Sequence, residues 1–452
     1  MPEFEPHFLT GAAGGRWTSP PRSPLTGFTA DSRTLRPGQV FVAVRTERRD
    51  GHDFLAAAAA AGAPAALVSA PRAGVDLPQL VVADPLSALQ AIARAHRRAF
   101  AGPVVGITGS AGKTSTKELL ALLLGAESGA AASPVLATEG NLNNHLGVPL
   151  TLLRLERSLH RFAVIEAGIS APGEMAPLAD MIEPDLALVT LVGPAHLAAL
   201  GGVEGVAREK AVLAARVRPG GCALFPPSCA NFAAFRALSG PTQIVAAAVQ
   251  QQGETTRFTL AGDGSGPYAL RRVSAGMAGN AALAVSAARR LGISPDQIRA
   301  RLARWAPAPL RGQVRRDGGR LVYLDCYNAN PASMADALGA FADLAPPGPG
   351  RLFVLGCMEE LGEGSGRYHR ELGESLRLGP ADLAILIGEQ AGEIQAGARV
   401  AGARADQLVV AAGAAEVSSL VESFAGPVFV KGSRRYRLET LAPGAGALQG
   451  AH

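Results

Sequence analysis

The chain has 452 residues, of which 48% are hydrophobic and 18% are charged. This length suggests roughly three domains at about 150 residues each. The composition is that of a globular protein, which excludes a fibrous or largely disordered chain. A net charge of +5 is small for the length, and the basic residues form no run interleaved with aromatic residues. We therefore expect no nucleic-acid binding.

Membrane proteins are excluded by the absence of any stretch of about 18 or more consecutive apolar residues. The amino terminus also lacks a basic segment followed by an apolar core, so we expect no membrane insertion. The four cysteines show no CxxC spacing and no obvious disulfide framework, which favours reduced thiols. We expect a cytoplasmic protein, and a monomer.

Short apolar runs bounded by Gly, Pro or Asp recur along the chain, separated by segments of helical periodicity. Runs that are continuous rather than alternating are typical of strands covered by helices on both faces. The sequence therefore predicts repeated α/β units with largely parallel sheets. In chain order the runs are 40–44, 65–68, 80–83, 104–108, 162–168, 186–192, 320–325, 351–356, 383–388 and 427–432.

Two seams divide the chain, "AFAGP" at 99–103 and "WAPAPLRG" at 305–312. A polar, glycine-rich region at 251–273 predicts β-hairpins between them. The predicted domains are 1–102, 103–308 and 309–452.

A glycine-rich turn, "GITGSAGKTSTKE", connects the predicted strand at 104–108 to a helix. Glycines let backbone N–H groups point at phosphate oxygens, and the helix amino terminus adds positive potential. Lys113 can reach the outer phosphates and Thr114 can hold magnesium. The spacing departs by one residue from the usual P-loop, because Ile107 stands where the first glycine is expected. We predict nucleotide binding by Thr108, Gly109, Ser110, Ala111, Gly112, Lys113, Thr114 and Ser115.

Three polar residues follow the next predicted strands. Glu166 ends "FAVIE", and a carboxylate at the carboxyl end of a parallel strand can face a metal held by the loop. An exposed strand-end glutamate is the alternative. His196 and Lys210 come after the run at 186–192. Taken singly, a histidine is more often structural and a lysine more often solvated.

Asparagines are concentrated in "TEGNLNNHLGVPLTLL" at 138–153 and in "LDCYNANPASM" at 324–334. Amide side chains offer donors and an acceptor without charge, which suits the recognition of peptide groups. Two Asn-rich turns are the alternative interpretation.

Together these stretches resemble the Mur ligases over nearly the whole chain. The motifs are "ADSRTLRPGQVFVAV", "DGHDF", "GITGSAGKTSTKE", "GNLNN", "GVPLTLLRL", "VIEAGISAPGEM", "AHL", "EKA", "DCYNANPASM", "GCMEELG", "YHRELGE" and "VKGSR". The family writes its loop as T-G-[ST]-x-G-K-[ST], which accounts for the spacing. The resemblance implies three α/β domains: one that binds a UDP-MurNAc-peptide, a central P-loop ATPase-like domain with a parallel sheet, and a Rossmann-like domain.

The resemblance implies an ATP- and Mg²⁺-dependent amide ligase that forms an acyl phosphate. "GNLNN" and "YNANP" indicate the members that join D-alanyl-D-alanine to UDP-N-acetylmuramoyl-tripeptide. By the same resemblance Thr114 and Glu166 hold one Mg²⁺, His196 helps hold a second, and Lys210 is carbamylated. It implies adenosine contacts from Asn280 and Asp325, uridine contacts from Asp31, Ser32 and Arg33, peptide contacts from Asn141, Asn143, Asn144, Tyr327, Asn328 and Asn330, and an approach of Lys431 on domain closure.

The chain departs from the family pattern in several places. Gly276 and Met277 replace a His-Asn pair, Gln313 replaces an arginine for which Arg311 or Arg315 could substitute, His145 replaces an acidic residue, and Cys357 replaces an aspartate. Two alternatives stay open: another amide ligase, either a Mur-type enzyme adding the diamino acid or one like folylpolyglutamate synthetase, and a non-catalytic nucleotide-binding relative. A P-loop motor or transport ATPase ranks lowest.

Overall fold

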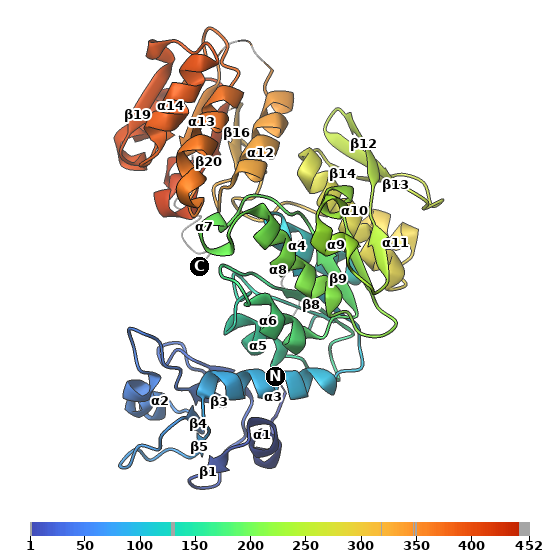
Figure 1. The fold of residues 1–452 in the computed structure, drawn as a ribbon, viewed down its shortest axis with the longest axis vertical. Coiled ribbons are helices and arrows are strands. Elements are labelled where there is room, and N and C mark those ends of the chain that lie inside the picture. The colour runs from blue at the N-terminus through green and yellow to red at the C-terminus, as the bar shows by residue number, and fades with distance from the viewer. Residues whose placement is uncertain (1, 128–131, 318, 347, 349, 443–452) are drawn as a thin grey trace.

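The computed structural model describes residues 2–127, 132–317, 319–346, 348 and 350–442, and it contains three α/β units arranged along the long axis of the molecule (Figure 1). The first unit has a five-stranded sheet of order β1-β5-β4-β3-β2, in which β1 pairs antiparallel with β5 and the other neighbours are parallel. Its elements are α1 (Pro6–Ala13), β1 (Arg16–Trp17), β2 (Gly27–Thr29), β3 (Gln39–Val42), α2 (Leu55–Ala60), β4 (Ala66–Val68), β5 (Gln79–Val81) and α3 (Pro85–Arg98).

The middle unit is built on a six-stranded parallel sheet of order β11-β10-β9-β6-β8-β7. Its strands are β6 (Val104–Thr108), β7 (Val135–Ala137), β8 (Phe162–Glu166), β9 (Leu186–Val189), β10 (Cys222–Phe225) and β11 (Thr242–Ile244). Its helices are α4 (Lys113–Leu124), α5 (Gly147–Leu152), α6 (Met175–Ile182), α7 (Leu197–Leu200), α8 (Val203–Ala215), α9 (Ala233–Arg236), α10 (Ala275–Arg290) and α11 (Pro295–Leu302).

The predicted hairpins form a separate antiparallel sheet within the middle unit, of order β12-β13-β14. Buried and exposed residues alternate along β13, as expected for a sheet with one solvated face. The strands are β12 (Ala247–Gln252), β13 (Thr255–Leu260) and β14 (Tyr268–Arg271).

The third unit has a six-stranded mixed sheet of order β15-β16-β20-β17-β18-β19, in which the edge strand β15 is antiparallel and the remaining pairs are parallel. Buried clusters cover both of its faces. Its elements are β15 (Gln313–Asp317), β16 (Arg320–Leu324), α12 (Pro331–Leu344), β17 (Leu352–Gly356), α13 (Ser365–Ser375), β18 (Leu383–Ile387), α14 (Ala391–Val400), β19 (Leu408–Ala411), α15 (Ser418–Ser423) and β20 (Val428–Lys431). The predicted fold class is confirmed, while the boundaries at 102 and 308 stay predictions.

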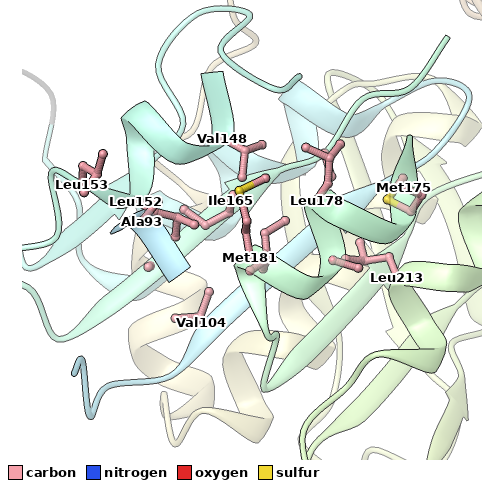
Figure 2. Close-up of a cluster of buried hydrophobic side chains, with 14 of the residues drawn as sticks. Ala93, Val104, Val148, Leu152, Leu153, Ile165, Met175, Leu178, Met181 and Leu213 are labelled. Atoms are coloured by element: carbon pink, nitrogen blue, oxygen red, sulfur yellow. The ribbon is translucent and has the colours of Figure 1, made fainter. Parts of the chain in front are cut away.

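Helix α3 joins the first two units through shared apolar packing. It packs against α1 in the first unit and against α5 and α6 in the middle unit. Ala93 of α3, Leu152 of α5 and Met181 of α6 belong to one buried cluster, which Figure 2 shows together with Val104 and Ile165 of the central sheet. A change in the angle between these two units would therefore disrupt a continuous core.

Two expectations from composition concern the surface and the thiols. Within the described ranges, no helix is both long enough and apolar enough to cross a membrane. Cys222, Cys229, Cys326 and Cys357 are all buried free cysteines. Burial raises the pKa of the Cys229 and Cys326 thiols to about 12. At neutral pH these thiols are therefore protonated.

Arg97 of α3 provides a test of how α3 is anchored. Its side chain is fully buried, and its guanidinium donates to the carbonyl oxygens of Ile182 and Glu183, each at 2.8 Å, and to Asp185 Oδ2 at 3.0 Å. Arg97→Met removes the donor to both carbonyl oxygens and the cation beside Asp185, so we expect a loss on the order of 3 kcal/mol in the free energy of unfolding, measured by urea denaturation. Arg94→Met is the control. Its ion pair with Glu183 is half-exposed, so its loss is expected to stay below about 1 kcal/mol; equal losses would contradict the assignment.

Candidate active site

A cavity of about 1090 Å³ lies between the middle and third units. The segments that line it include the loop at 110–115, the end of β8 at Glu166, the asparagine-rich loop at 140–145, and the segment at 325–333 after β16. Because β6 and β8 are parallel neighbours, their carboxyl ends deliver the glycine loop and Glu166 to the same edge of the sheet.

The glycine loop has a conformation that other residues would not tolerate. Gly109 and Gly112 have φ values of 153° and 80°. A Cβ at Gly109 would lie 1.9 Å from Thr190 Oγ1, and one at Gly112 would lie 2.3 Å from Asn280 Nδ2. Lys113 begins α4, and its Nζ donates to Gly109 O at 2.8 Å. The loop therefore presents backbone N–H groups and a helix amino terminus together, which is the geometry of a phosphate site. Asn280 packs against the loop.

Glu166 accepts hydrogen bonds from α4 and from the asparagine-rich loop. It is 2% exposed. Thr114 Oγ1 donates to its Oε2 at 3.0 Å, and Asn143 Nδ2 donates to its Oε1 at 2.8 Å. A hydroxyl and a carboxylate in contact are the hard oxygen ligands that Mg²⁺ prefers. In the described part of the chain no group of three His, Cys, Asp or Glu could hold a metal. This donor set fits an ion that takes its remaining ligands from phosphates and water.

Lys210, on α8, is 2% exposed and has no hydrogen bond among the described residues. Burial lowers the pKa of its ammonium group well below the ordinary value, and the charge of Lys113 lowers it further. Burial also lowers the pKa of Lys113, which Glu166 raises and Arg311 lowers. Lys210 is not among the described residues that line the cavity.

His196 lines the cavity and follows β9 in the sequence. Burial lowers the pKa of its imidazole, while Glu360 of the third unit, which pairs with Nδ1, raises it. The predicted Mg²⁺ ligand therefore belongs to the middle unit and pairs with a residue of the third unit.

The third unit contributes a polar wall. Lys431 is 1% exposed, and its Nζ donates to Asp325 Oδ2 at 2.6 Å and to Asn328 O at 3.2 Å. Asn330 Nδ2 donates to Ser110 O at 3.1 Å, so the third unit touches the glycine loop directly. The predicted nucleotide and peptide contacts that line the cavity from the third unit are Asp325, Tyr327, Asn328, Asn330 and Lys431. From the middle unit, the asparagines among them are Asn141, Asn143, Asn144 and Asn280.

Some predicted site residues lie elsewhere. Asp31 and Arg33 form an exposed pair in the first unit, with Ser32 between them, outside the cavity. Arg33 donates to Asp31 and lowers the pKa of that carboxyl to about 2. Thr108 is fully buried at the end of β6, and its Oγ1 has no hydrogen-bond partner in the described chain. The cavity brings together most of the residues predicted to contact the nucleotide and the peptides, but not Thr108, Gly109 or the three residues predicted to contact uridine.

The departures from the family pattern also have distinct locations. Gly276 and Met277 line the cavity, and Gly276 N donates to Asp336 Oδ1 at 2.8 Å. A Cβ at Gly276 would lie 2.6 Å from Asp336 Oδ2, so glycine leaves room for this contact between units. His145 lines the cavity, whereas Cys357 is buried in the core of the third unit.

Gln313 and Arg311 point to different places. Gln313 Oε1 accepts from Arg315 and lines a second cavity of about 280 Å³. Arg311 lines the large cavity, with its guanidinium carbon 4.0 Å from the centre of the Tyr327 ring. Of the two possible substitutes for the missing arginine, Arg311 is the one in the cavity wall.

Three residues that act on the site were not predicted. Lys117, 2% exposed, donates to Thr138 O at 2.7 Å, and Thr138 Oγ1 accepts from Glu166 N at 2.9 Å. This pair fixes the start of the asparagine-rich loop beside Glu166. Glu360 is the third residue. The signal for Lys117 and Glu360 lay inside the quoted motifs "GKTSTKE" and "GCMEELG", but a charged residue in a motif does not reveal its partner.

Three family models match successive parts of the sequence. The Mur ligase family catalytic domain matches residues 24–97, the Mur ligase middle domain matches 107–262, and the Mur ligase glutamate ligase domain matches 310–434. UDP-N-acetylmuramoyl-tripeptide--D-alanyl-D-alanine ligase of Escherichia coli is 33% identical over 431 residues, covering 92% of each chain. The Bacillus subtilis protein of the same name is 31% identical over 83% of this chain and 82% of its own.

Solved structures give the same assignment. MurF from Acinetobacter baumannii matches with a TM-score of 0.85 and 30% identity over 98% of both chains. MurF ligase from Thermotoga maritima in complex with ADP matches with a TM-score of 0.77 and 28% identity, over 92% of this chain and 96% of its own. Folylpolyglutamate synthase from Mycobacterium tuberculosis, at 18% identity and a TM-score of 0.59, shares the fold alone. From its sequence and its three-unit architecture, this chain belongs to the Mur ligase family.

Proposed function

We propose that this protein is an ATP-dependent ligase that joins D-alanyl-D-alanine to UDP-N-acetylmuramoyl-tripeptide in the cytoplasm, completing the peptide of the peptidoglycan precursor. The observation that carries the proposal is that the glycine loop, Glu166 and the two asparagine-rich segments all line the same cavity. The relatives that align with most of this chain carry the name of that reaction.

The reaction explains why the cavity holds these residue types. A carboxylate becomes a good acyl donor when one of its oxygens attacks the terminal phosphorus of ATP, giving an acyl phosphate and ADP. The amine of D-alanyl-D-alanine then attacks the acyl carbon, an amide forms, phosphate leaves and the amine loses a proton. Several negative charges meet in the first step, so Lys113 and Arg311, which face the same cavity, supply the opposing charge.

Residues for the cation and the nucleotide follow from the same proposal. Thr114 and Glu166 would hold one Mg²⁺ and His196 would help to hold a second, and the bound cation would neutralise charge on the phosphates. A carbamate on Lys210 would turn a buried cation into an anion. Asn280 and Asp325 would contact adenosine.

The substrates would occupy the rest of the wall. The asparagines of the loop at 140–145 and the segment 327–330 would hydrogen-bond the two peptides, because uncharged amides can pair with peptide groups at either a donor or an acceptor. Asp31, Ser32 and Arg33 would bind the uridine nucleotide on the first unit. Contact of Asn330 with Ser110 O helps to exclude water, to which an acyl phosphate is sensitive.

The first prediction concerns the product. Purified protein with ATP, magnesium and D-alanyl-D-alanine should release phosphate when given UDP-MurNAc-tripeptide ending in meso-diaminopimelate or in lysine. Mass spectrometry should then find the pentapeptide with at least one of them, and the faster substrate identifies the natural third residue. A reaction without D-alanyl-D-alanine is the control. Measurable ATP binding with no pentapeptide from either substrate would refute the proposed function.

The second prediction concerns Lys113. Lys113→Ala removes the ammonium group nearest the glycine loop, so turnover should fall by at least on the order of 100-fold. Folding should be retained, because the bond from Lys113 to Gly109 O is a single contact at the cavity edge. Phosphate release and thermal unfolding are measured side by side. Full activity in this variant would remove Lys113 from the proposed role.

The third prediction concerns Lys210. Carbon dioxide reacts with a neutral amine, and burial lowers the pKa of Lys210, so its neutral form persists to lower pH than that of a free lysine. We expect a carbamate signal in ¹³C NMR after incubation with labelled bicarbonate, growing as pH rises through the lowered pKa and lost as the amine is protonated. The signal should be absent from Lys210→Arg. An identical signal in that variant would rule out Lys210 as its source.

A further inference from the structure

His196 and Glu360 meet across the interface between the middle and third units. His196 precedes α7, and Glu360 lies just before the 3₁₀ turn η3 (Gly362–Gly364). Nδ1 of His196 pairs with Glu360 Oε2, and the backbone N–H of Leu197 donates to Glu360 O at 3.1 Å. One residue of the third unit therefore contacts both the ring and the backbone of this segment.

Both partners have unusual backbone conformations. His196 and Glu360 have φ values of 52° and 62°, in the left-handed region that residues other than glycine disfavour. The fit around them is close, since a Cβ added at Gly362 would lie 3.1 Å from Ala198 Cα. Strained residues of this kind persist where their surroundings hold them, and they concentrate at functional sites. Here each strained residue faces the other.

This pair is a poor candidate for a purely stabilising contact. The side chain of Glu360 is 61% exposed and that of His196 is 30% exposed. Ion pairs with this much solvent contribute little to folding. The arrangement of the ring is the more informative feature, because a neutral imidazole with a carboxylate at Nδ1 places its proton there.

The other ring nitrogen is then an acceptor. Nε2 of His196 has no hydrogen bond among the described residues, and the ring lines the large cavity. Histidines that bind metals commonly donate their second nitrogen to a carboxylate, which fixes the tautomer and the ring orientation. The pairing supplies that condition, with the carboxylate coming from a different structural unit.

We propose that Glu360 is a positioning residue that holds His196 in its Nδ1–H tautomer, with Nε2 available to the cation that accompanies the nucleotide. Because Glu360 belongs to the third unit, His196 has this orientation only while that unit is docked on the middle unit. Docking and cation affinity are thereby coupled. The inference rests on the proposed function only in taking the cavity as a nucleotide and Mg²⁺ site.

The tautomer is tested directly by NMR of the full-length protein labelled with ¹⁵N-histidine. Long-range proton–nitrogen correlations distinguish the two tautomers, and the signal missing from His196→Gln assigns the ring. We expect wild-type His196 to show a protonated Nδ1 and an unprotonated Nε2. In Glu360→Met, which keeps the side-chain length but has no acceptor, that preference should disappear. A wild-type ring protonated at Nε2 would overturn the proposal.

Cation affinity provides a second readout. Mn²⁺ binding to protein loaded with a non-hydrolysable ATP analogue is measured by electron paramagnetic resonance. Glu360→Met should weaken binding by on the order of 10-fold, and Glu360→Gln, which keeps an acceptor oxygen, should lose less. The matched control is Glu363→Met, an exposed glutamate three residues away. Equal affinities in Glu360→Met and Glu363→Met would overturn the proposal.

Neither readout depends on which peptides the protein joins. Failure to make the pentapeptide would refute the proposed ligase reaction and leave the tautomer measurement valid. A Glu360→Met variant that has lost the Nδ1–H tautomer but keeps full activity would refute the role of Glu360 alone. If Glu360→Met unfolds, the wild-type tautomer and the Glu360→Gln affinity still decide the question.

Discussion

Lys113 and Arg311 bring positive charge to the part of the cavity where Glu166 is the neighbouring carboxylate. Like charges in a partly desolvated site repel one another, and burial penalises each charged form. A polyanion relieves both costs at once. The glycine loop adds to this preference because its backbone donors and the amino terminus of α4 face the same space. The remaining parts of the site are arranged around this unbalanced charge.

The two interfaces of the middle unit differ in their chemistry. Toward the first unit the packing runs through α3 into a common apolar core, to which Arg97 adds buried polar contacts. Toward the third unit many contacts are single polar ones, such as Asn330 with Ser110 O and Asp336 with Gly276 N. Polar contacts of this kind can be exchanged for water at small net cost. We therefore expect substrates to shift the third unit rather than the first.

Much of the fold could be predicted from the sequence because it depends on local patterns. Continuous apolar runs placed the buried parallel strands, and the motif around Lys113 placed the strand, turn and helix of the glycine loop. Convergence of Glu166 with Thr114 followed from the rule that parallel strands end at one edge. These inferences need no knowledge of which segments far apart in the sequence touch.

The unpredicted features depend on such contacts. Glu360 was visible as a residue of a motif, but its pairing with His196 depends on how two units dock. The reason for Gly276 was hidden in the same way, because the space it leaves is filled by Asp336 from another unit. Arg311, and not Arg315, lines the large cavity, and sequence spacing does not reveal the left-handed backbone at Leu310 and Gly312 on either side of it.

The distribution of lysine has a practical consequence. The chain has four lysines and 39 arginines. Lys117, Lys210 and Lys431 are 2%, 2% and 1% exposed, and Lys113, which is partly exposed, lies in the cavity wall. Positive charge on the surface therefore comes mainly from arginine, which amine-reactive reagents do not modify. A reagent that acylates lysine would therefore find its accessible side chain inside the cleft, and the extent of labelling would report whether the cleft is occupied.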